Sequence, residues 1–239
     1  KGRWVTDDYT ADLIEGAFEK ARAPLFHFTT TIQNHMSYTA DKYGPGYRFP
    51  PTGVSGLSEE AETLLSVYVE GVRDADAMLG RLWKYFDAQS EPVVLVYWGD
   101  HLPYLGNDML GYKELGVDVA PGPDGRENLA AYKTPYVLWA NDSAAEVLDW
   151  DNAVEALDLP ETVSACFLGA AVLELTGRGE ESPWFSFLNA LRRELPVVQK
   201  STYQLADGSF TEELSGEQRE LVQKWRRWSY YKLQYKEVP

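Results

Sequence analysis

The sequence predicts an α/β fold in which helices pack on both faces of a central sheet. Val93 to Trp98 form an unbroken apolar run, which is typical of a strand buried on both faces in a parallel sheet. A long amphipathic helix, expected over residues 58–86, comes directly before this run. Helix followed by buried strand is the pattern of α/β layer folds.

The N-terminal part of the chain repeats this alternation. Apolar residues at helical spacing predict a helix over residues 9–22. Residues 25–32 then predict a strand, with His27 in its middle and packed against neighbouring structure. Residues 39–57 are rich in Gly, Pro, Tyr and Asp, and they predict a loop.

Later elements are marked by caps and breakers. Ser58 is expected to cap the long helix, and Ser215 opens a Ser-Gly-Glu-Gln capping box. The remaining expected elements are a loop over 102–131, a strand over 135–140, and helices over 162–175, 182–195 and 215–231.

Composition excludes some classes of function. The 239 residues carry 37 acidic and 22 basic side chains, for a net charge of −15, so no basic stripe is available to bind nucleic acid. No apolar run is long enough to predict a transmembrane helix. The single cysteine, Cys166, excludes an internal disulfide and is expected to be a small buried hydrophobe.

The strongest candidate for chemistry is Gly99-Asp100-His101, at the end of the predicted central strand. Ligands in open α/β sheets gather at the carboxyl ends of strands, and both Asp and His bind metals. A surface turn would explain the same tripeptide, because Gly and Asp favour turns. The tripeptide alone leaves both interpretations open.

Other polar and aromatic residues have two interpretations each. Asn34 and His35 follow the predicted strand over 25–32, where they could meet a ligand or form a loop. Arg48 and Lys133 could reach a phosphate or be solvated at the surface. An aromatic cluster in the last predicted helix could bind a glycan, but core packing is favoured; it comprises Trp225, Trp228, Tyr230 and Tyr231.

Several segments together resemble the lipoteichoic acid synthase-like proteins, in the sulfatase branch of the alkaline phosphatase superfamily. The matching segments are Thr31–Tyr38, Val96–Gly106, Tyr132–Trp139 and the helix near Thr162 to Gly177. Their order and approximate spacing also fit, so the resemblance covers most of the chain.

This resemblance implies that residues 1–239 are the C-terminal portion of one sulfatase-like catalytic domain, a partial sandwich with a central sheet. It implies that Asp100 and His101 bind a divalent metal, manganese first, with magnesium, zinc or calcium as alternatives. His35 would contact a glycerol-phosphate group, and Asn34 would position His35 or the substrate. The Thr nucleophile, an acidic metal ligand and membrane helices are expected before Lys1, so no catalytic residue is assigned in this chain.

The implied function is a metal-dependent phosphoglycerol transferase of the cell envelope. Its substrates would be a glycerol-phosphate lipid and an envelope polymer or glycan, at the extracellular face of a Gram-positive membrane. Alternatives are a sulfatase, phosphodiesterase or phosphoethanolamine transferase on the same scaffold, or a non-catalytic binding fragment. Without its nucleophile, the fragment alone is expected to be inactive. Because their strands would end at one sheet edge, His35, Asp100 and His101 are expected to converge.

Overall fold

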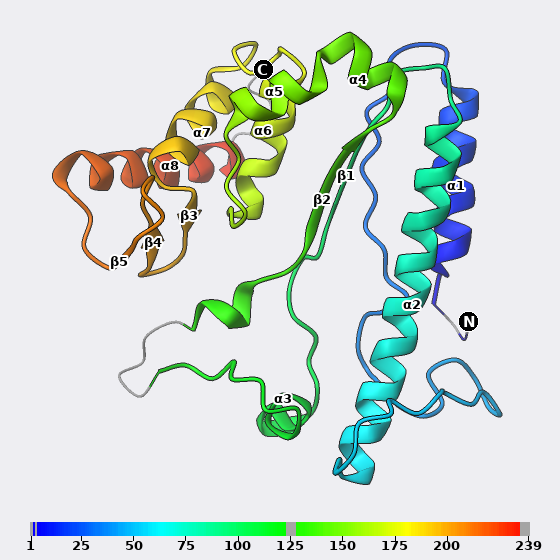
Figure 1. Cartoon of the computed structure of the whole chain (residues 1–239). Coiled ribbons are helices and arrows are strands. Elements are labelled where there is room, and N and C mark those ends of the chain that lie inside the picture. The colour runs from blue at the N-terminus through cyan, green and yellow to red at the C-terminus, as the bar shows by residue number, and fades with distance from the viewer. Residues whose placement is uncertain (1, 3, 123–127, 235–239) are drawn as a thin grey trace. The chain divides into compact units, whose positions relative to one another are not determined.

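The computed structural model describes residues 2, 4–122 and 128–234 (Figure 1). The chain forms two compact units. The first runs to Pro121 and includes Asn128–Asn141, and the second contains the chain from Asp142 onward.

Two helices form one layer of the first unit, α1 (Asp7–Lys20) and α2 (Glu59–Asp87). They lie side by side (Figure 1). Their caps follow the local sequence: Thr6 Oγ1 accepts a hydrogen bond from the Tyr9 backbone N–H, and Ser58 Oγ accepts one from Ala61. Glu114 adds a second tie, because its carboxylate accepts hydrogen bonds from both the backbone N–H and the hydroxyl of Ser58. The predicted helices and the Ser58 cap are therefore confirmed.

The sheet of the first unit has two strands, β1 (Val94–Trp98) and β2 (Tyr136–Ala140). They pair antiparallel, with Val96 opposite Leu138. Alternate residues of the sheet pack against α1 and α2; this cluster contains Ala11, Ile14, Phe18, Met78, Leu82, Tyr85, Phe86, Val93, Leu95, Tyr97 and Trp139. The sheet is thus held on the helical layer by one face.

The structure corrects two predictions about strands. The central strand was expected to be parallel and buried on both faces, but β1 is antiparallel to β2 and all its residues are half-buried. The predicted strand over 25–32 does not form, because these residues have no strand partner in the described part of the chain and are all exposed. His27 is exposed with them, so its predicted packing is also wrong.

The long connection between the two strands contains short helical pieces. These are η1 (Asn107–Met109), α3 (Leu110–Glu114) and η2 (Leu129–Tyr132). The expected loop over 102–131 is therefore confirmed in outline, although residues 123–127 of its Pro-Gly-Pro-Asp-Gly region lie outside the described residues.

The second unit is mainly helical, with a small antiparallel sheet in the order β3-β4-β5. Its helices are α4 (Asp142–Leu148), α5 (Trp150–Leu157), η3 (Ala165–Phe167), α6 (Leu168–Leu175), α7 (Pro183–Glu194) and α8 (Gly216–Gln234). Its strands are β3 (Val197–Val198), β4 (Tyr203–Gln204) and β5 (Phe210–Thr211). Phe167, Leu188 and Leu191 lie at the centre of its core.

Local signals placed several of these helices correctly. The capping box of α8 is present, since Gln218 N–H donates to Ser215 Oγ at 3.2 Å and Ser215 N–H donates to Gln218 Oε1 at 3.0 Å. Gly177, at φ +73°, ends α6 as expected. Cys166 is exposed in η3, so its predicted burial is wrong. No helix of the described residues is both long and apolar enough to cross a membrane.

Candidate functional site

The Asp100-His101 pair is held at the end of β1 by contacts with the chain that enters β2. Gly99 donates its N–H to the Pro135 carbonyl at 3.0 Å, and the Thr134 hydroxyl donates to the Gly99 carbonyl at 2.7 Å. A Cβ on Gly99 would lie only 3.0 Å from Thr134 Cβ. Glycine at this position therefore permits the close approach that fixes the backbone before Asp100.

The two side chains of the pair face each other. Asp100 Oδ2 lies 3.5 Å from His101 Nε2, while Asp100 Oδ1 accepts the His101 backbone N–H at 2.9 Å. His101 Nδ1 lies 2.8 Å from the Leu102 carbonyl. Because a carbonyl oxygen only accepts, Nδ1 carries a proton, and in the neutral ring the Nε2 lone pair lies beside the carboxylate.

This geometry suits two ligands of one metal ion. Oxygen and imidazole ligands at about 2.1 Å from a tetrahedral ion are separated by about 3.4 Å, close to the observed 3.5 Å. A hydrogen bond from the other ring nitrogen to a backbone carbonyl is also one of the usual ways in which a metal-binding histidine is oriented. The described residues contain no group of three or more His, Cys, Asp or Glu placed to hold a metal, so Asp100 and His101 would supply only part of a coordination sphere.

The chain beyond this pair is fastened to α2. Leu105 is buried and its carbonyl accepts the Gly111 N–H at 2.9 Å. Gly106, at φ +93°, lies against Leu64 of α2, where a Cβ would come within 2.8 Å of that side chain. The Tyr112 hydroxyl donates to the Pro103 carbonyl at 2.7 Å. These contacts limit the freedom of the segment that follows His101.

His35 lies in a compact turn after the extended segment. Its backbone N–H donates to the Ile32 carbonyl at 3.1 Å, and its Nδ1 donates to the Met36 carbonyl at 3.0 Å. The imidazole is exposed, with its ring centre 6.3 Å from that of Trp4. As in His101, the backbone carbonyl of the next residue fixes the proton on Nδ1 and leaves Nε2 for a ligand.

Asn34 is directed at α2. Its Oδ1 atom is buried against Gly71, and its backbone carbonyl accepts a hydrogen bond from the Tyr38 hydroxyl at 2.9 Å. This placement favours the positioning role that was one of its two predicted roles.

The two motif segments meet on the same part of α2. Tyr38, from the His35 turn, and Leu105, from the chain after His101, belong to one buried cluster with Leu65. Burial raises the pKa of Tyr38, and the neighbouring Tyr68 and Tyr112, followed by the Asp100 carboxylate, raise it further. The shared cluster thus places the chain after His35 and the chain after His101 against the same part of α2.

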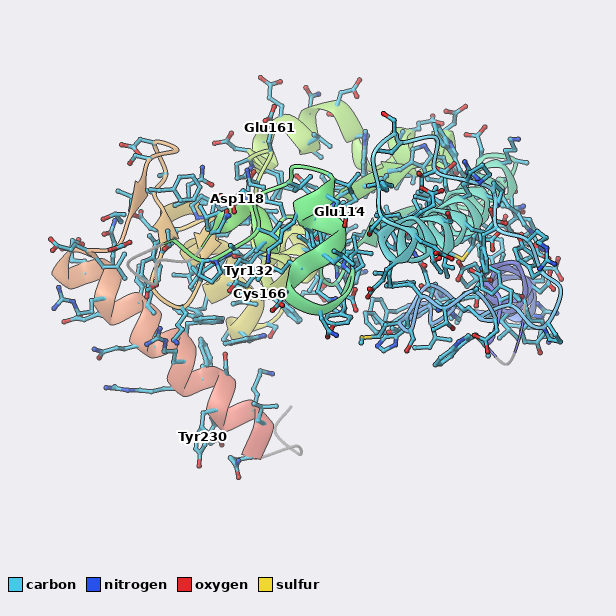
Figure 2. All side chains as sticks on the ribbon, turned by 90° about the horizontal axis from the view of Figure 1, so that it is seen from below. Glu114, Asp118, Tyr132, Glu161, Cys166 and Tyr230 are labelled. Atoms are coloured by element: carbon cyan, nitrogen blue, oxygen red, sulfur yellow. The ribbon has the colours of Figure 1, made fainter. Side chains whose placement is uncertain are left out.

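The remaining candidates divide between core and surface. Arg48 and Lys133 are exposed. Trp225 and Trp228 pack against the core of the second unit, as favoured from the sequence, whereas Tyr230 is exposed on α8 (Figure 2).

Two polar residues near the site, Lys42 and Gln33, are buried, which was not predicted from the sequence. Buried Gln33 accepts the Asp7 backbone N–H at 2.9 Å and donates to Tyr43 and to Asp74. It thereby joins α1 and α2 directly before Asn34. Neither residue has a local signal, because a polar residue beside a predicted loop is ordinarily solvated.

Residues 3–177 match the family model described as Sulfatase, which is well over half of the chain. The chain therefore belongs to the sulfatase family.

Two comparisons extend this assignment. A protein of Rhizobium meliloti (strain 1021), named as a candidate cyclic beta-1,2-glucan modification protein, is 27% identical over 190 residues, covering 78% of this chain and 27% of the relative. The solved Streptococcus pyogenes phosphoglycerol transferase GacH, in complex with sn-glycerol-1-phosphate, has a TM-score of 0.62 at 18% identity. That match covers 99% of this chain and 53% of the GacH chain.

The structural match confirms the predicted partial sulfatase-like α/β fold of the alkaline phosphatase superfamily. The chain spans about half of the solved protein and about a quarter of the curated relative.

Proposed function

We propose that this chain is part of a metal-dependent phosphoglycerol transferase that modifies cell-envelope glycans. The observation that carries the proposal is the Asp100-His101 pair, whose Oδ2 and Nε2 atoms lie 3.5 Å apart. The relatives give it a substrate class, because one is a phosphoglycerol transferase and the other is named for glucan modification. We place the reaction at the extracellular face of the membrane, where envelope glycans are accessible, with the whole enzyme anchored in that membrane.

Asp100 and His101 would hold the metal, with manganese as the first expectation. A bound divalent ion would stabilise negative charge on the transferred phosphoryl group. Exposed His35 would donate a hydrogen bond from its imidazolium to a phosphate oxygen, or as a neutral ring accept one from a glycerol hydroxyl. Asn34 would hold the His35 turn on α2. The nucleophilic Thr and a further acidic ligand would come from sequence outside residues 1–239, so this fragment alone would not turn over substrate.

The proposal is tested on the whole enzyme that contains this chain. Transfer of glycerol phosphate from phosphatidylglycerol to a glucan acceptor is measured with and without Mn²⁺, and metal content is measured in parallel. Asp100→Asn and His101→Gln should abolish metal binding and transfer together. His35→Gln should lower kcat by about 10²- to 10⁴-fold with the metal still bound. His27→Gln is the matched control, because His27 is an exposed histidine outside both motif turns.

Because the chain belongs to the sulfatase family, sulfate-ester hydrolysis is the result that would change the proposed substrate class. If the enzyme hydrolyses a sulfate ester with the same dependence on Asp100 and His101, but transfers no glycerol phosphate, it is a sulfatase. Full metal binding by both the Asp100→Asn and His101→Gln variants would refute the assigned metal site itself.

A further inference from the structure

Lys42 is a buried cation in the loop that follows the His35 turn. The Lys42 residue is only 8% exposed to solvent. Its Nζ donates to the backbone carbonyl of His35 and, at 3.3 Å, to that of Ser37. The same atom lies 5.2 Å from the ring centre of Tyr38 and 5.6 Å from that of Trp4. A single ammonium group thus contacts both backbone carbonyls and lies close to both aromatic rings.

The environment of Lys42 differs from that of an ordinary structural lysine. Among the described residues no carboxylate forms an ion pair with it, although the chain as a whole is strongly acidic. Burial lowers the pKa of its ammonium group. The cation is stabilised instead by carbonyl dipoles and ring faces, which are attractive for a positive charge.

These contacts act on the backbone at His35 itself. The His35 carbonyl accepts from Lys42 while the His35 N–H donates to Ile32, so both backbone polar groups of the residue are used. The Met36 carbonyl accepts the hydrogen bond from the imidazole. In the sequence, Met36 stands between His35 and Ser37, whose carbonyls both accept hydrogen bonds from Lys42. Small shifts of this three-residue segment would therefore move the ring.

We propose that Lys42 is the positioning residue of His35: it holds the 35–37 backbone so that Nδ1 donates to Met36 and Nε2 faces a phosphate-bearing substrate. The catalytic consequence rests on the proposed function, but the positioning itself is a property of this chain alone. An alternative role in folding only would leave the His35 ring geometry unchanged once the protein is folded.

The test reads the ring directly. The chain has three histidines, so long-range ¹H–¹⁵N spectra at pH 8 resolve the tautomer of each after assignment with single His→Gln variants. In the unsubstituted chain, His35 and His101 should both show the Nδ1–H form, because each donates Nδ1 to a backbone carbonyl. Exposed His27, which forms no hydrogen bond from its ring within the described part of the chain, should show the mixture of tautomers of a free imidazole.

Lys42→Met should move the His35 signals toward those of His27 and leave His101 in its Nδ1–H form. Lys84→Met, at an exposed position on α2, is the control and should change neither ring. If circular dichroism shows that Lys42→Met is unfolded, Lys42→Arg is measured instead. This variant keeps the cation and should fold. Its His35 signals should shift partly, because the longer guanidinium displaces the carbonyls. A folded Lys42 variant, Met or Arg, in which His35 keeps the unsubstituted spectrum would overturn the proposal, as would loss of folding by both.

Activity then separates this inference from the proposed function. In the whole enzyme, Lys42→Met should lower kcat about 10²-fold, the scale expected for misplacing a reacting group by about 1 Å, with metal affinity unchanged. If the tautomer shifts but glycerol-phosphate transfer is absent even from the unsubstituted enzyme, the positioning role stands and the proposed function fails.

Discussion

Asn34 and Gly71 are packed so closely that only glycine fits at position 71. A Cβ there would lie 2.0 Å from Asn34 Oδ1 and 2.4 Å from its Cγ. Because His35 is the next residue, this contact sets the distance between the His35 turn and the middle of α2.

Gly71→Ala should therefore destabilise the protein by about 1–3 kcal/mol, as expected when a packed contact is overfilled. Gly80→Ala, on the same helix but with open space around it, should instead stabilise by up to about 1 kcal/mol, because alanine favours helix. Denaturant unfolding measures both. Adding Asn34→Ala to Gly71→Ala should recover part of the loss, and equal effects of the two glycine substitutions would contradict the close contact.

Asn141 joins three segments of the first unit, and its removal should cost about 2–3 kcal/mol. Its Oδ1 accepts the Val93 N–H at 2.9 Å, and its Nδ2 donates to the carbonyls of Phe86, Gln89 and Glu91. Asn141→Ala would leave these four backbone groups, which form buried or partly buried hydrogen bonds, without that partner. Asn152→Ala, at an exposed site on α5, should change unfolding free energy by less than about 0.5 kcal/mol.

Two neighbouring arginines share Glu174 but differ in burial. The Arg192 side chain is 1% exposed and also donates to the Leu157 carbonyl at 3.1 Å, whereas the Arg193 side chain is 52% exposed. Arg192→Met should cost about 2–3 kcal/mol, because it removes the donor from a buried carbonyl and breaks a partly buried ion pair. Arg193→Met should cost at most about 1 kcal/mol. Thermal unfolding should show a clearly higher melting temperature for Arg193→Met than for Arg192→Met.

Glu62 makes stability depend on acidic pH. Hydrogen bonds to its carboxylate from the side chain and then the backbone N–H of Thr52 hold the pKa of Glu62 below its ordinary value of 4.5. Since the pKa of Glu62 is lowered in the folded state, these hydrogen bonds add to the free energy of unfolding in full above about pH 4.5. The gain is lost as the pH falls through the folded-state pKa. Glu62→Gln should thus be less stable than the unsubstituted chain at pH 7, with the difference narrowing below about pH 4. Glu60→Gln, at an exposed position of α2, should show no such narrowing.

Local signals predicted the helices and the strand end that carries Asp100 and His101, and non-local contacts decided the rest. Ser58, Ser215 and Gly177 act where they stand, so α2, α8 and the end of α6 could be predicted. The direction of β1 could not, because its partner β2 follows a long connection that the strand sequence does not encode. The strands β3–β5 contain two residues each, too few for a periodic pattern.

The site shows the same division. The placement of Asp100 and His101 at a strand end follows from the apolar run and the residues after it. Burial of Lys42 depends on Trp4 and Tyr38, which approach only in the folded chain, so its sequence suggested a solvated loop. The roles of Asp100, His101, His35 and Asn34 with ligands stay predictions.

The exposed segment from Leu25 to Ile32 has a consequence for handling the protein. It is extended, half apolar and without a strand partner among the described residues, and Phe26 is 89% exposed. Such a segment is a template for backbone pairing with another molecule. This stretch is therefore the expected site of association when residues 1–239 are handled as a separate chain, and Phe26→Lys should reduce aggregation in concentrated samples.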